Sequence, residues 1–421
     1  MNDTIYARNA RLPLPSEAPL PARTDVLVVG GGLTGLSAAL HLTRSGFWVT
    51  LVDAGAIGDG ASGRNGGQLH TGQRRDQAWL EKQLGMKMAR ALWRLGEEAI
   101  ALIHQLRSEL SAPCDYQAGL IEAAHTPAAL DQLHWYNDHL HKHYGVTQEL
   151  LDKHALESAI GTDRYHGGVR DGLGGHMNPL ALVNAIAQAA HVEGARLHSG
   201  VKAVGHTLTA RGWRVSVDQG GKRHEILAQN VILAGNGYMR GVSPYVEARV
   251  MPLLNHIVAT APLETPLIPG GEAVADSRYV IRYFRQDAQG RMVFGGGESF
   301  GRTPRNVARK VRPFLAEVYP ALKNAPIEAA WSGTLGISRL RLPIIRRLEP
   351  GLYAGAGFSG QGLGAATFAG KVIADAVAGE SSRLDVFGRV PAPAFPGGTL
   401  MRAPLAQVAM TWFAIRDRLG V

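Results

Sequence analysis

The chain has 421 residues, of which 45% are hydrophobic and 19% charged, and its formal net charge is +9. This length and composition predict a globular protein with a large core and two domains, and exclude a disordered or fibrous chain. No apolar run approaches the ~18 residues of a membrane-spanning helix. The basic residues are dispersed in short groups such as Arg74-Arg75 and Arg346-Arg347. We therefore expect no nucleic-acid partner, and an anionic cofactor or carboxylated substrate instead.

Residues 1–23 are polar and proline-rich and lack the order of a signal peptide, so we predict an extended N-terminal arm. The single cysteine, Cys114, rules out an intrachain disulfide framework and fits a cytoplasmic protein. Residues 386–421 are predicted to form a helical tail whose apolar face packs on its own domain, and we do not expect membrane contact.

An apolar strand, Asp25-Val26-Leu27-Val28-Val29, runs directly into a glycine-rich turn and then a helical pattern. Gly30, Gly32 and Gly35 have the G-x-G-x-x-G spacing, which brings backbone amides to a pyrophosphate at a helix N-terminus. A second strand ends at Asp53, about 20 residues later, where an acid can bind a ribose hydroxyl. The order of these elements predicts dinucleotide binding.

The middle of the chain shows further helices and strands. Apolar residues at spacings of three and four predict helices over 80–110 and 127–144, and Asn178-Pro179 is a typical helix start. His139 and His143 have the spacing of metal ligands, but no third ligand completes a site, so we expect a solvated helix face and no metal. Strand signals follow at 213–217, 230–235, 250–260 and 278–298, and the last two suggest an antiparallel sheet.

A second strand, glycine turn and helix occupy residues 351–377. Two helix N-termini directed into one cleft suit the two ends of FAD, because its pyrophosphate is anionic and its ring gains negative charge when reduced.

These motifs resemble the FAD-dependent D-amino-acid oxidase superfamily, and most of all its gamma-glutamylputrescine oxidase-like branch. The resemblance rests on Gly30–Gly35, Asp53, the loop from Gly58 to Gln68, and Gly357–Gly362, and it covers nearly the whole chain. It implies an α/β fold with a discontinuous Rossmann-like FAD-binding domain and a substrate domain built on an antiparallel sheet. We place the first at 24–79, 153–243 and 334–385, and the second at 80–152 and 244–333.

The resemblance also implies which residues contact FAD. Those near the pyrophosphate and adenosine are Gly30, Gly32, Leu33, Thr34, Gly35, Asp53, Ala54, Val201, Ala234 and Gly235. Those near the flavin are Ala61, Ser62, Gly63, Arg64, Asn65, Gly66, Gly67, Gln68, Gly357, Ser359, Gly360, Gln361, Gly362 and Leu363. No cysteine is available at the position that tethers flavin in some sarcosine oxidases, so we expect non-covalent FAD.

The implied reaction is oxidation of an amine or N-substituted amino acid, with oxygen as the electron acceptor and hydrogen peroxide as a product. Substrate contacts are predicted for His256, Arg282, Tyr283, Trp331 and Gln361, with His70, Tyr116 and Tyr136 as further candidates. Each has an alternative structural role: His256 and Trp331 as core residues, and Arg282 as a solvent-facing residue.

The chain departs from the family at two places. Gln361 stands where histidine is more common, and Ser338-Arg339-Leu340-Arg341 replaces a Thr-Asp-x-x pattern. Two other functions stay open. One is a dehydrogenase that passes electrons to a quinone or a carrier protein, and the other is a non-catalytic flavin-binding subunit. The sequence leaves the oligomeric state undetermined.

Overall fold

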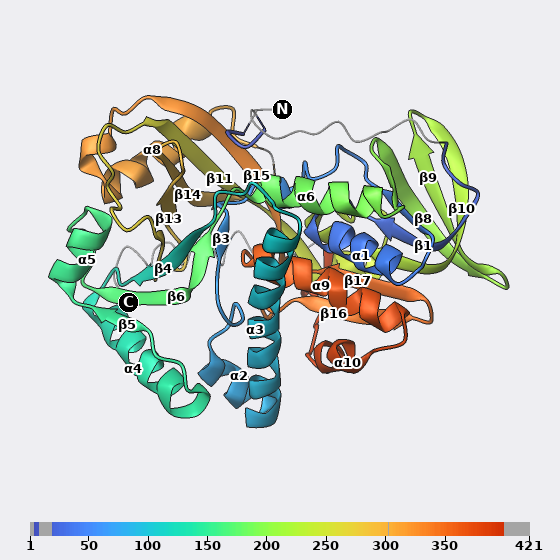
Figure 1. The fold of residues 1–421 in the computed structure, drawn as a ribbon, viewed down its shortest axis with the longest axis horizontal. Helices are drawn as coiled ribbons and strands as arrows, with labels where there is room; N and C mark the ends of the chain where they lie inside the picture. The colour runs from blue at the N-terminus through green and yellow to red at the C-terminus, as the bar shows by residue number, and fades with distance from the viewer. Residues whose placement is uncertain (1–3, 8–18, 302, 400–421) are drawn as a thin grey trace.

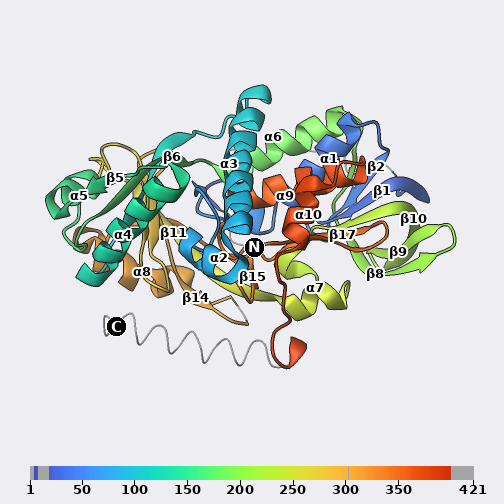
Figure 2. The ribbon, with the colours of Figure 1, turned by 90° about the horizontal axis from the view of Figure 1, so that it is seen from below.

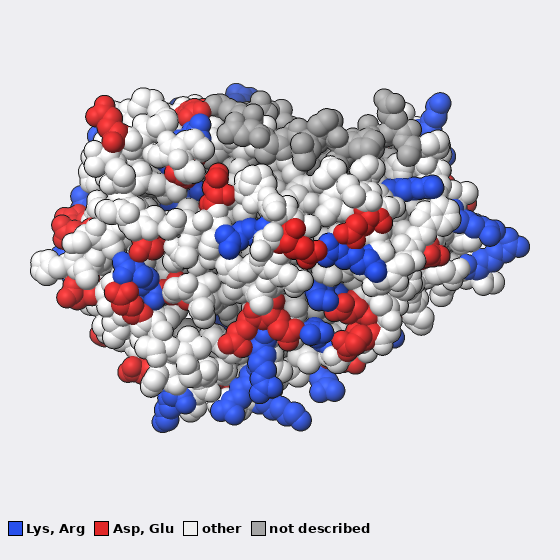
Figure 3. Space-filling view, viewed as in Figure 1, with Lys and Arg blue, Asp and Glu red and all other residues white. Residues whose placement is uncertain are grey.

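The structure is a computed structural model that describes residues 4–7, 19–301 and 303–399. Two sheets lie side by side, with the long helix α3 (Met86–Glu109) between them in the view of Figure 1. No helix in these described ranges is long and apolar enough to cross a membrane. On the face drawn in Figure 3, basic and acidic side chains are interspersed rather than gathered by sign.

The first sheet has the strand order β16-β17-β10-β1-β2-β7, and β8 and β9 join it through β10. The strands β17, β10, β1, β2 and β7 are parallel, and β16 is antiparallel to β17. Their bounds are β1 (Arg23–Val29), β2 (Val49–Val52), β7 (Arg196–His198), β8 (Val201–Thr209), β9 (Gly212–Gln219), β10 (Lys222–Leu233), β16 (Ile344–Glu349) and β17 (Leu352–Ala356).

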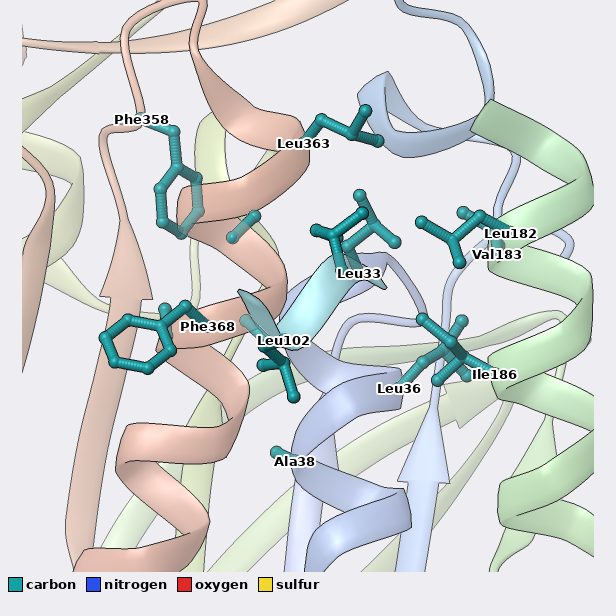
Figure 4. Close-up of a cluster of buried hydrophobic side chains, with 14 of the residues drawn as sticks. Leu33, Leu36, Ala38, Leu102, Leu182, Val183, Ile186, Phe358, Leu363 and Phe368 are labelled. Atoms are coloured by element: carbon teal, nitrogen blue, oxygen red, sulfur yellow. The ribbon is translucent and has the colours of Figure 1, made fainter. Parts of the chain in front are cut away.

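Strand β1 is buried on both faces, which explains its continuous apolar run. Val26 and Val28 pack with the helices α1 (Leu33–Arg44), α6 (Pro179–Val192) and α9 (Gly362–Val377). Leu27 packs on the opposite side with residues of β8 to β10. Figure 4 shows Leu33, Leu36, Val183, Ile186 and Leu363 converging from the three helices.

The second sheet has the order β15-β11-β14-β13-β12-β4-β6-β3, with β5 on β6. Its pairs are antiparallel, as predicted, except for the parallel pair of β4 and β12. The bounds are β3 (Gln68–Leu69), β4 (Gln117–Ala123), β5 (Glu149–Leu151), β6 (Gly168–His176), β11 (Val250–Pro262), β12 (Ala273–Asp276), β13 (Tyr283–Gln286), β14 (Arg291–Ser299) and β15 (Ile327–Ser338).

Helices α5 (Lys153–Ile160) and α8 (Val307–Val318) cover the second sheet, and α4 (Pro127–Tyr144) lies beside α5 (Figure 1). The core that α5 and α8 share with this sheet includes Phe284 and Phe294, whose rings stack with centroids 5.6 Å apart. Figure 2 shows α2 (Gln77–Leu84) at one end of α3. The remaining helices are α7 (Pro244–Arg249) and α10 (Ser382–Gly388).

Most predicted elements are confirmed, including the helix over 127–144 and the cap at Asn178, whose Oδ1 accepts bonds from Leu180 and Ala181. The helix predicted over 80–110 is broken at Gly85, where φ is +82°. Residues 278–282 are not a strand, because β13 begins only at Tyr283.

Two strands of the second sheet come from residues that we assigned to the FAD-binding domain. They are β3, within 24–79, and β6, within 153–243, and β6 pairs with both β3 and β4. Residues 4–7 of the predicted extended arm form a turn, and Tyr6 is buried against Trp331. Residues 400–421 of the predicted tail lie outside the described ranges.

Candidate active site

One large cavity runs along the boundary between the two sheets. Its volume is about 1430 Å³, which exceeds the roughly 300–1,000 Å³ of an ordinary small-molecule pocket. Both glycine turns open onto it, and so do strands of the second sheet. The cavity therefore has room for an extended cofactor and a further ligand.

The first glycine turn brings the backbone close to the neighbouring strand and to the Ala61–Gln68 loop. Gly30 has φ +115°, and a Cβ there would lie 2.7 Å from the carbonyl carbon of Ala234. A Cβ on Gly32 would lie 2.7 Å from Ser62 Oγ. At Gly35 it would lie 1.9 Å from the carbonyl oxygen of Gly30, so this glycine permits helix packing and does not line the cavity.

Two helix N-termini meet the cavity without a side-chain cap. Helix α1 begins after Gly32 and α9 after Gln361, and neither has an acidic residue in its first turn. Helices α2, α4, α5, α6, α7 and α8, by contrast, all have a capping side chain. The N–H of Leu33 donates to Ser62 Oγ over 3.0 Å, and the remaining first-turn amides of α1 and α9 leave donors and partial positive charge for an anionic ligand.

Asp53 lines the cavity at the end of β2. Its carboxylate oxygens accept hydrogen bonds from the backbone N–H groups of Gly31 and Gly55, each over 2.7 Å. These bonds fix the orientation of the carboxylate and leave each oxygen further acceptor capacity. This arrangement suits a ribose hydroxyl, as the sequence predicts.

The Ala61–Gln68 loop is held by its own polar groups, by the preceding Asp59, and by side chains of the second sheet. Arg64 pairs with Asp59 over 2.9 Å, and Asn65 donates to the Ala61 and Ser62 carbonyls. Arg64 and Asn65 thus shape the loop as well as lining the cavity.

The second glycine turn is tied to the end of β10. Asn236 Oδ1 accepts a bond from the N–H of Gly357 over 2.8 Å, and Ser359 adopts a left-handed conformation with φ +56°. Asn236 was missed as a site residue, although it directly follows Ala234 and Gly235, which are predicted FAD contacts.

Most of the predicted FAD contacts line this cavity: Gly30, Gly32, Leu33, Thr34, Asp53, Ala54, Ala61, Ser62, Arg64, Asn65, Gly66, Gln68, Val201, Ala234, Gly235, Ser359, Gly360, Gln361, Gly362 and Leu363. Gly35, Gly63, Gly67 and Gly357 are not among the lining residues. Gly63 and Gly67 instead permit close packing, since a Cβ would lie 2.3 Å from Gly58 O and 2.0 Å from Met177 O, respectively.

Of the predicted substrate contacts, Tyr283 and Gln361 line the cavity, as do His70 and Tyr136. The Tyr283 hydroxyl donates to Asn255 Oδ1, and burial raises the pKa of Tyr283 well above its usual value. Tyr283 is therefore a hydrogen-bonding phenol at neutral pH and not a base. Burial and the charge of Arg74 lower the pKa of His70 to about 4, so His70 is neutral.

His256 does not line the cavity, which corrects its expected substrate contact. It is fully buried, with Nδ1 2.7 Å from Ser332 Oγ and Nε2 2.8 Å from Ser299 Oγ. Burial and the nearby Lys310 lower its pKa to about 4. His256 therefore joins β11 to β15 and β14 as a neutral side chain.

Arg282, Trp331 and Tyr116 also lie outside the cavity wall. Arg282 is buried, contrary to a solvent-facing role; it donates to Val280 O and lies over the Phe314 ring. Trp331 is fully buried, and its Nε1–H donates to Arg64 O over 2.9 Å. These residues support the wall from behind because their polar groups bind protein rather than facing the cavity.

The ionisable residues of the cavity wall that were missed as site residues include Arg74, Glu122, Glu298 and Arg341. The pKa of both Glu122 and Glu298 is raised, because the effect of burial exceeds the opposite effect of nearby arginines. The residues come from four distant segments, so no local motif joins them.

These features fit FAD. The glycine cradle at 30–35, the uncapped α1 and the oriented Asp53 would hold the adenosine and pyrophosphate half. The Ala61–Gln68 loop and α9 would hold the flavin half.

Comparisons with known proteins agree with this geometry. The model of the DAO family, described as FAD dependent oxidoreductase, matches residues 25–376. The chain is 37% identical to a probable oxidoreductase, OrdL, of Rhizobium meliloti (strain 1021), over 95% of this chain and 94% of the relative. It is 36% identical to gamma-glutamylputrescine oxidoreductase of Escherichia coli (strain K12), over 94% and 93%.

Solved structures share the fold. Glycine oxidase from Geobacillus kaustophilus superposes with a TM-score of 0.72 at 22% identity, covering 85% of this chain and 95% of that one. L-proline dehydrogenase from P. horikoshii gives 0.74 at 21% identity, covering 87% and 96%. The chain therefore belongs to the DAO family of FAD-dependent oxidoreductases, enzymes that act on C–N bonds of amines and amino acids.

Proposed function

We propose that this enzyme is an FAD-dependent oxidase of an amine or N-substituted amino acid, such as a gamma-glutamylputrescine-like conjugate or an N-alkyl amino acid. The observation that carries the proposal is the continuity of the cavity. It extends from both cofactor-binding helix ends to the wall that carries His70, Tyr283 and Glu298. The relationship to gamma-glutamylputrescine oxidoreductase over nearly the whole chain supports this class of substrate.

Bound, non-covalent FAD would supply the acceptor for the hydride from the carbon that bears nitrogen. Hydrolysis of the imine product by water, and oxygen as the final electron acceptor with hydrogen peroxide as its product, complete the proposed reaction. The protein orients the C–H bond and excludes water. Tyr283 is a protonated donor at the cavity wall, and His70 is a neutral neighbour. Neither residue needs to change its protonation state at neutral pH.

The test is an anaerobic flavin-bleaching screen of the holoenzyme. The probes are gamma-glutamylputrescine, free putrescine, N-methyl amino acids and D-amino acids. We expect bleaching by at least one amine. If none reduces the flavin, the alternative of a non-catalytic flavin-binding subunit is favoured.

A second step separates oxidase from dehydrogenase. Reduced enzyme is mixed with oxygen in a stopped-flow instrument, and peroxide is assayed. Rapid reoxidation with stoichiometric peroxide supports the oxidase. Slow reoxidation without peroxide, with fast transfer to a quinone, supports the dehydrogenase.

The single cysteine is compatible with our proposal of a cytoplasmic location.

A further inference from the structure

The N-terminal turn at residues 4–7 lies inside the protein, although it precedes the first strand of the FAD-binding domain. The N–H of Ala7 donates to Thr4 O over 3.1 Å, and Thr4, Ile5 and Tyr6 are buried. Ile5 and Tyr6 belong to the same apolar core as helices α1 and α9. None of these four residues lines the cavity. The turn therefore packs behind the cavity wall and does not reach a ligand.

Tyr6 contacts two side chains that come from separate strands of the second sheet. Its ring meets the ring of Trp331, on β15, edge-on, with centroids 5.5 Å apart and planes at 73°. Its hydroxyl oxygen accepts a hydrogen bond from Nη2 of Arg285, on β13, over 3.2 Å. Strands β14 and β11 separate β13 from β15 in the sheet. Tyr6 thus joins two side chains that the strand pairing does not make neighbours.

Each of these two side chains holds one carbonyl of the Ala61–Gln68 loop. Nε1–H of Trp331 donates to Arg64 O over 2.9 Å, and Nε–H of Arg285 donates to Gly66 O over 2.7 Å. Both donor side chains are buried, and the two carbonyls are only two residues apart. The path of the loop between them is therefore fixed from outside the loop.

Arg285 depends on Tyr6 for one of its hydrogen-bond acceptors. Arg285 is buried, and it forms no ion pair with any residue in the described part of the chain. Its acceptors there are Gly66 O and the Tyr6 hydroxyl. Removal of the hydroxyl would leave a buried charged donor without a partner, which costs more than the loss of an exposed bond. The guanidinium would then be free to turn away from Gly66.

A movement of Arg285 would reach the cavity through the loop. Arg64, Asn65 and Gly66 line the cavity, in the part that we assign to the flavin half. Gly66 is also closely packed, since a Cβ there would lie 2.5 Å from the ring of Tyr283, another residue of the cavity wall. The position of the Gly66 carbonyl therefore affects the shape of the wall on both sides of the loop.

We propose that Tyr6 is a positioning residue for the Ala61–Gln68 loop, so that the N-terminal turn is required for tight and correctly oriented binding of FAD. Tyr6 acts through Trp331 and Arg285 and touches no ligand itself. The proposal depends on the FAD-binding role of the loop and not on the substrate or the electron acceptor. The competing interpretation is that Tyr6 is an ordinary core residue, which stabilises the fold as a whole.

The first test compares Tyr6 with a matched tyrosine in the holoenzyme. The variants are Tyr6→Ala and Tyr6→Phe, with Tyr319→Ala and Tyr319→Phe as controls. Tyr319 is also buried, lies edge-on to an aromatic ring, that of Phe284, at 5.4 Å and 81°, and donates from its hydroxyl to Ile160 O. Neither Tyr319 nor Phe284 lines the cavity.

Three quantities are measured for each variant. The Kd for FAD is obtained from the fluorescence of cofactor released on dilution of the holoenzyme. The visible circular dichroism of the bound flavin reports the shape of its site, and the unfolding midpoint reports the stability of the fold. We expect Tyr6→Ala to raise the Kd about tenfold and to change the circular dichroism. Tyr319→Ala should lower the midpoint and leave both flavin measurements unchanged.

Tyr6→Phe keeps the ring on Trp331 and removes only the acceptor of Arg285, so we expect its Kd to rise about fivefold, with no rise in Tyr319→Phe. Wild-type flavin binding in Tyr6→Ala, together with a lowered midpoint as in Tyr319→Ala, overturns the proposal. If Tyr6→Ala does not fold, Tyr6→Phe decides, because it preserves the volume of the ring. Wild-type flavin binding in that variant is then the overturning result.

A second test asks whether the Tyr6 hydroxyl acts through Arg285. The Kd for FAD is compared in Tyr6→Phe, Arg285→Gln and the double variant. Side chains that act in one chain of contacts are not additive, so the double variant should bind FAD as Arg285→Gln does. Multiplied effects of the two single changes would contradict the positioning role. Neither test uses a substrate, so a failed flavin-bleaching screen leaves both results intact.

Discussion

The hydroxyl of Ser62 accepts a hydrogen bond from the backbone N–H of Leu33 over 3.0 Å, and so ties the Ala61–Gln68 loop to the start of α1. We predict that Ser62→Ala weakens FAD binding by about 1 kcal/mol, the net value of one such bond, or roughly fivefold in Kd. Titration of apoprotein with FAD measures this. Ser45→Ala, which removes an exposed bond to His41 O at the other end of the helix, should leave Kd unchanged.

Asp53→Asn tests the ribose contact. The amide keeps the shape, but one of the two acceptors facing Gly31 and Gly55 becomes a donor group. We expect the Kd for FAD to rise by about tenfold or more, since losing a charged acceptor costs roughly 1.5–3 kcal/mol. Asp25→Asn is the control, because Asp25 also accepts a backbone bond, from Trp48, but lies outside the cavity. Equal affinities of the two variants would contradict the assignment.

A bulky side chain at Gly32 should abolish cofactor retention. Its Cβ would press on Ser62 Oγ, and the remainder would occupy the cradle in front of α1. Gly32→Leu protein should purify without the yellow colour of flavin. At Gly205 a Cβ would meet no atom within 4 Å, so Gly205→Ala should remain fully loaded. A yellow Gly32→Leu protein would contradict the cradle.

Buried neutral histidines predict loss of stability in acid. The pKa is lowered to about 4 at His256 and about 3 at His176 by burial first. Below pH 6.5 the unfolded chain binds these protons and the folded one does not. Each histidine therefore lowers the free energy of unfolding by as much as about 1.4 kcal/mol per pH unit as the pH falls from 6.5 to the pKa of the folded state.

The histidine effect is isolated by comparing variants. Glu122 and Glu298 act in the opposite direction, because their pKa values are raised. Urea unfolding of the wild type and His256→Gln at pH 4.5 and 7 should show a smaller acid loss in the variant. Parallel losses would show that His256 is not neutral in the folded protein.

Trp331 is predicted to stabilise the Ala61–Gln68 loop rather than to contact substrate. Trp331→Phe leaves the Arg64 carbonyl without its buried donor and should lower the free energy of unfolding by about 1–3 kcal/mol. The limiting rate of flavin reduction should change little. Trp48→Phe, at a residue 42% exposed, is the matched control. A large drop in reduction rate without loss of stability would reverse the assignment.

The sequence predicted the features that depend on local pattern. The glycine turn at 30–35, the cap at Asn178 and the strand before Asp53 follow from spacing and residue type, and the structure has all three. The break at Gly85 was not predicted because apolar periodicity continues across it. A positive φ does not disturb such a pattern.

The residues that the second sheet contributes to the cavity wall were largely not predicted, for a different reason. Whether His256 or Tyr283 faces the cavity depends on strand register and on what covers each face of the second sheet. Arg74 and Arg341 line the same cavity although they are far apart in sequence, and Arg75 donates to Leu340 O across the same separation. Such pairings have no signal in a single sequence.

The parallel strands beside the cavity come from distant parts of the chain: β1 pairs with β10, and β10 with β17. Helix α9, which packs on α1, follows β17. During synthesis, the N-terminal glycine turn emerges early but lacks one neighbouring strand until residues 222–233 appear, and lacks the opposite half of the cavity until α9 is made. Because these contacts are distant in sequence, their formation is slow. A nascent or truncated chain ending before residue 350 should therefore be unable to capture flavin, which makes cofactor loading a late event in the life of this enzyme.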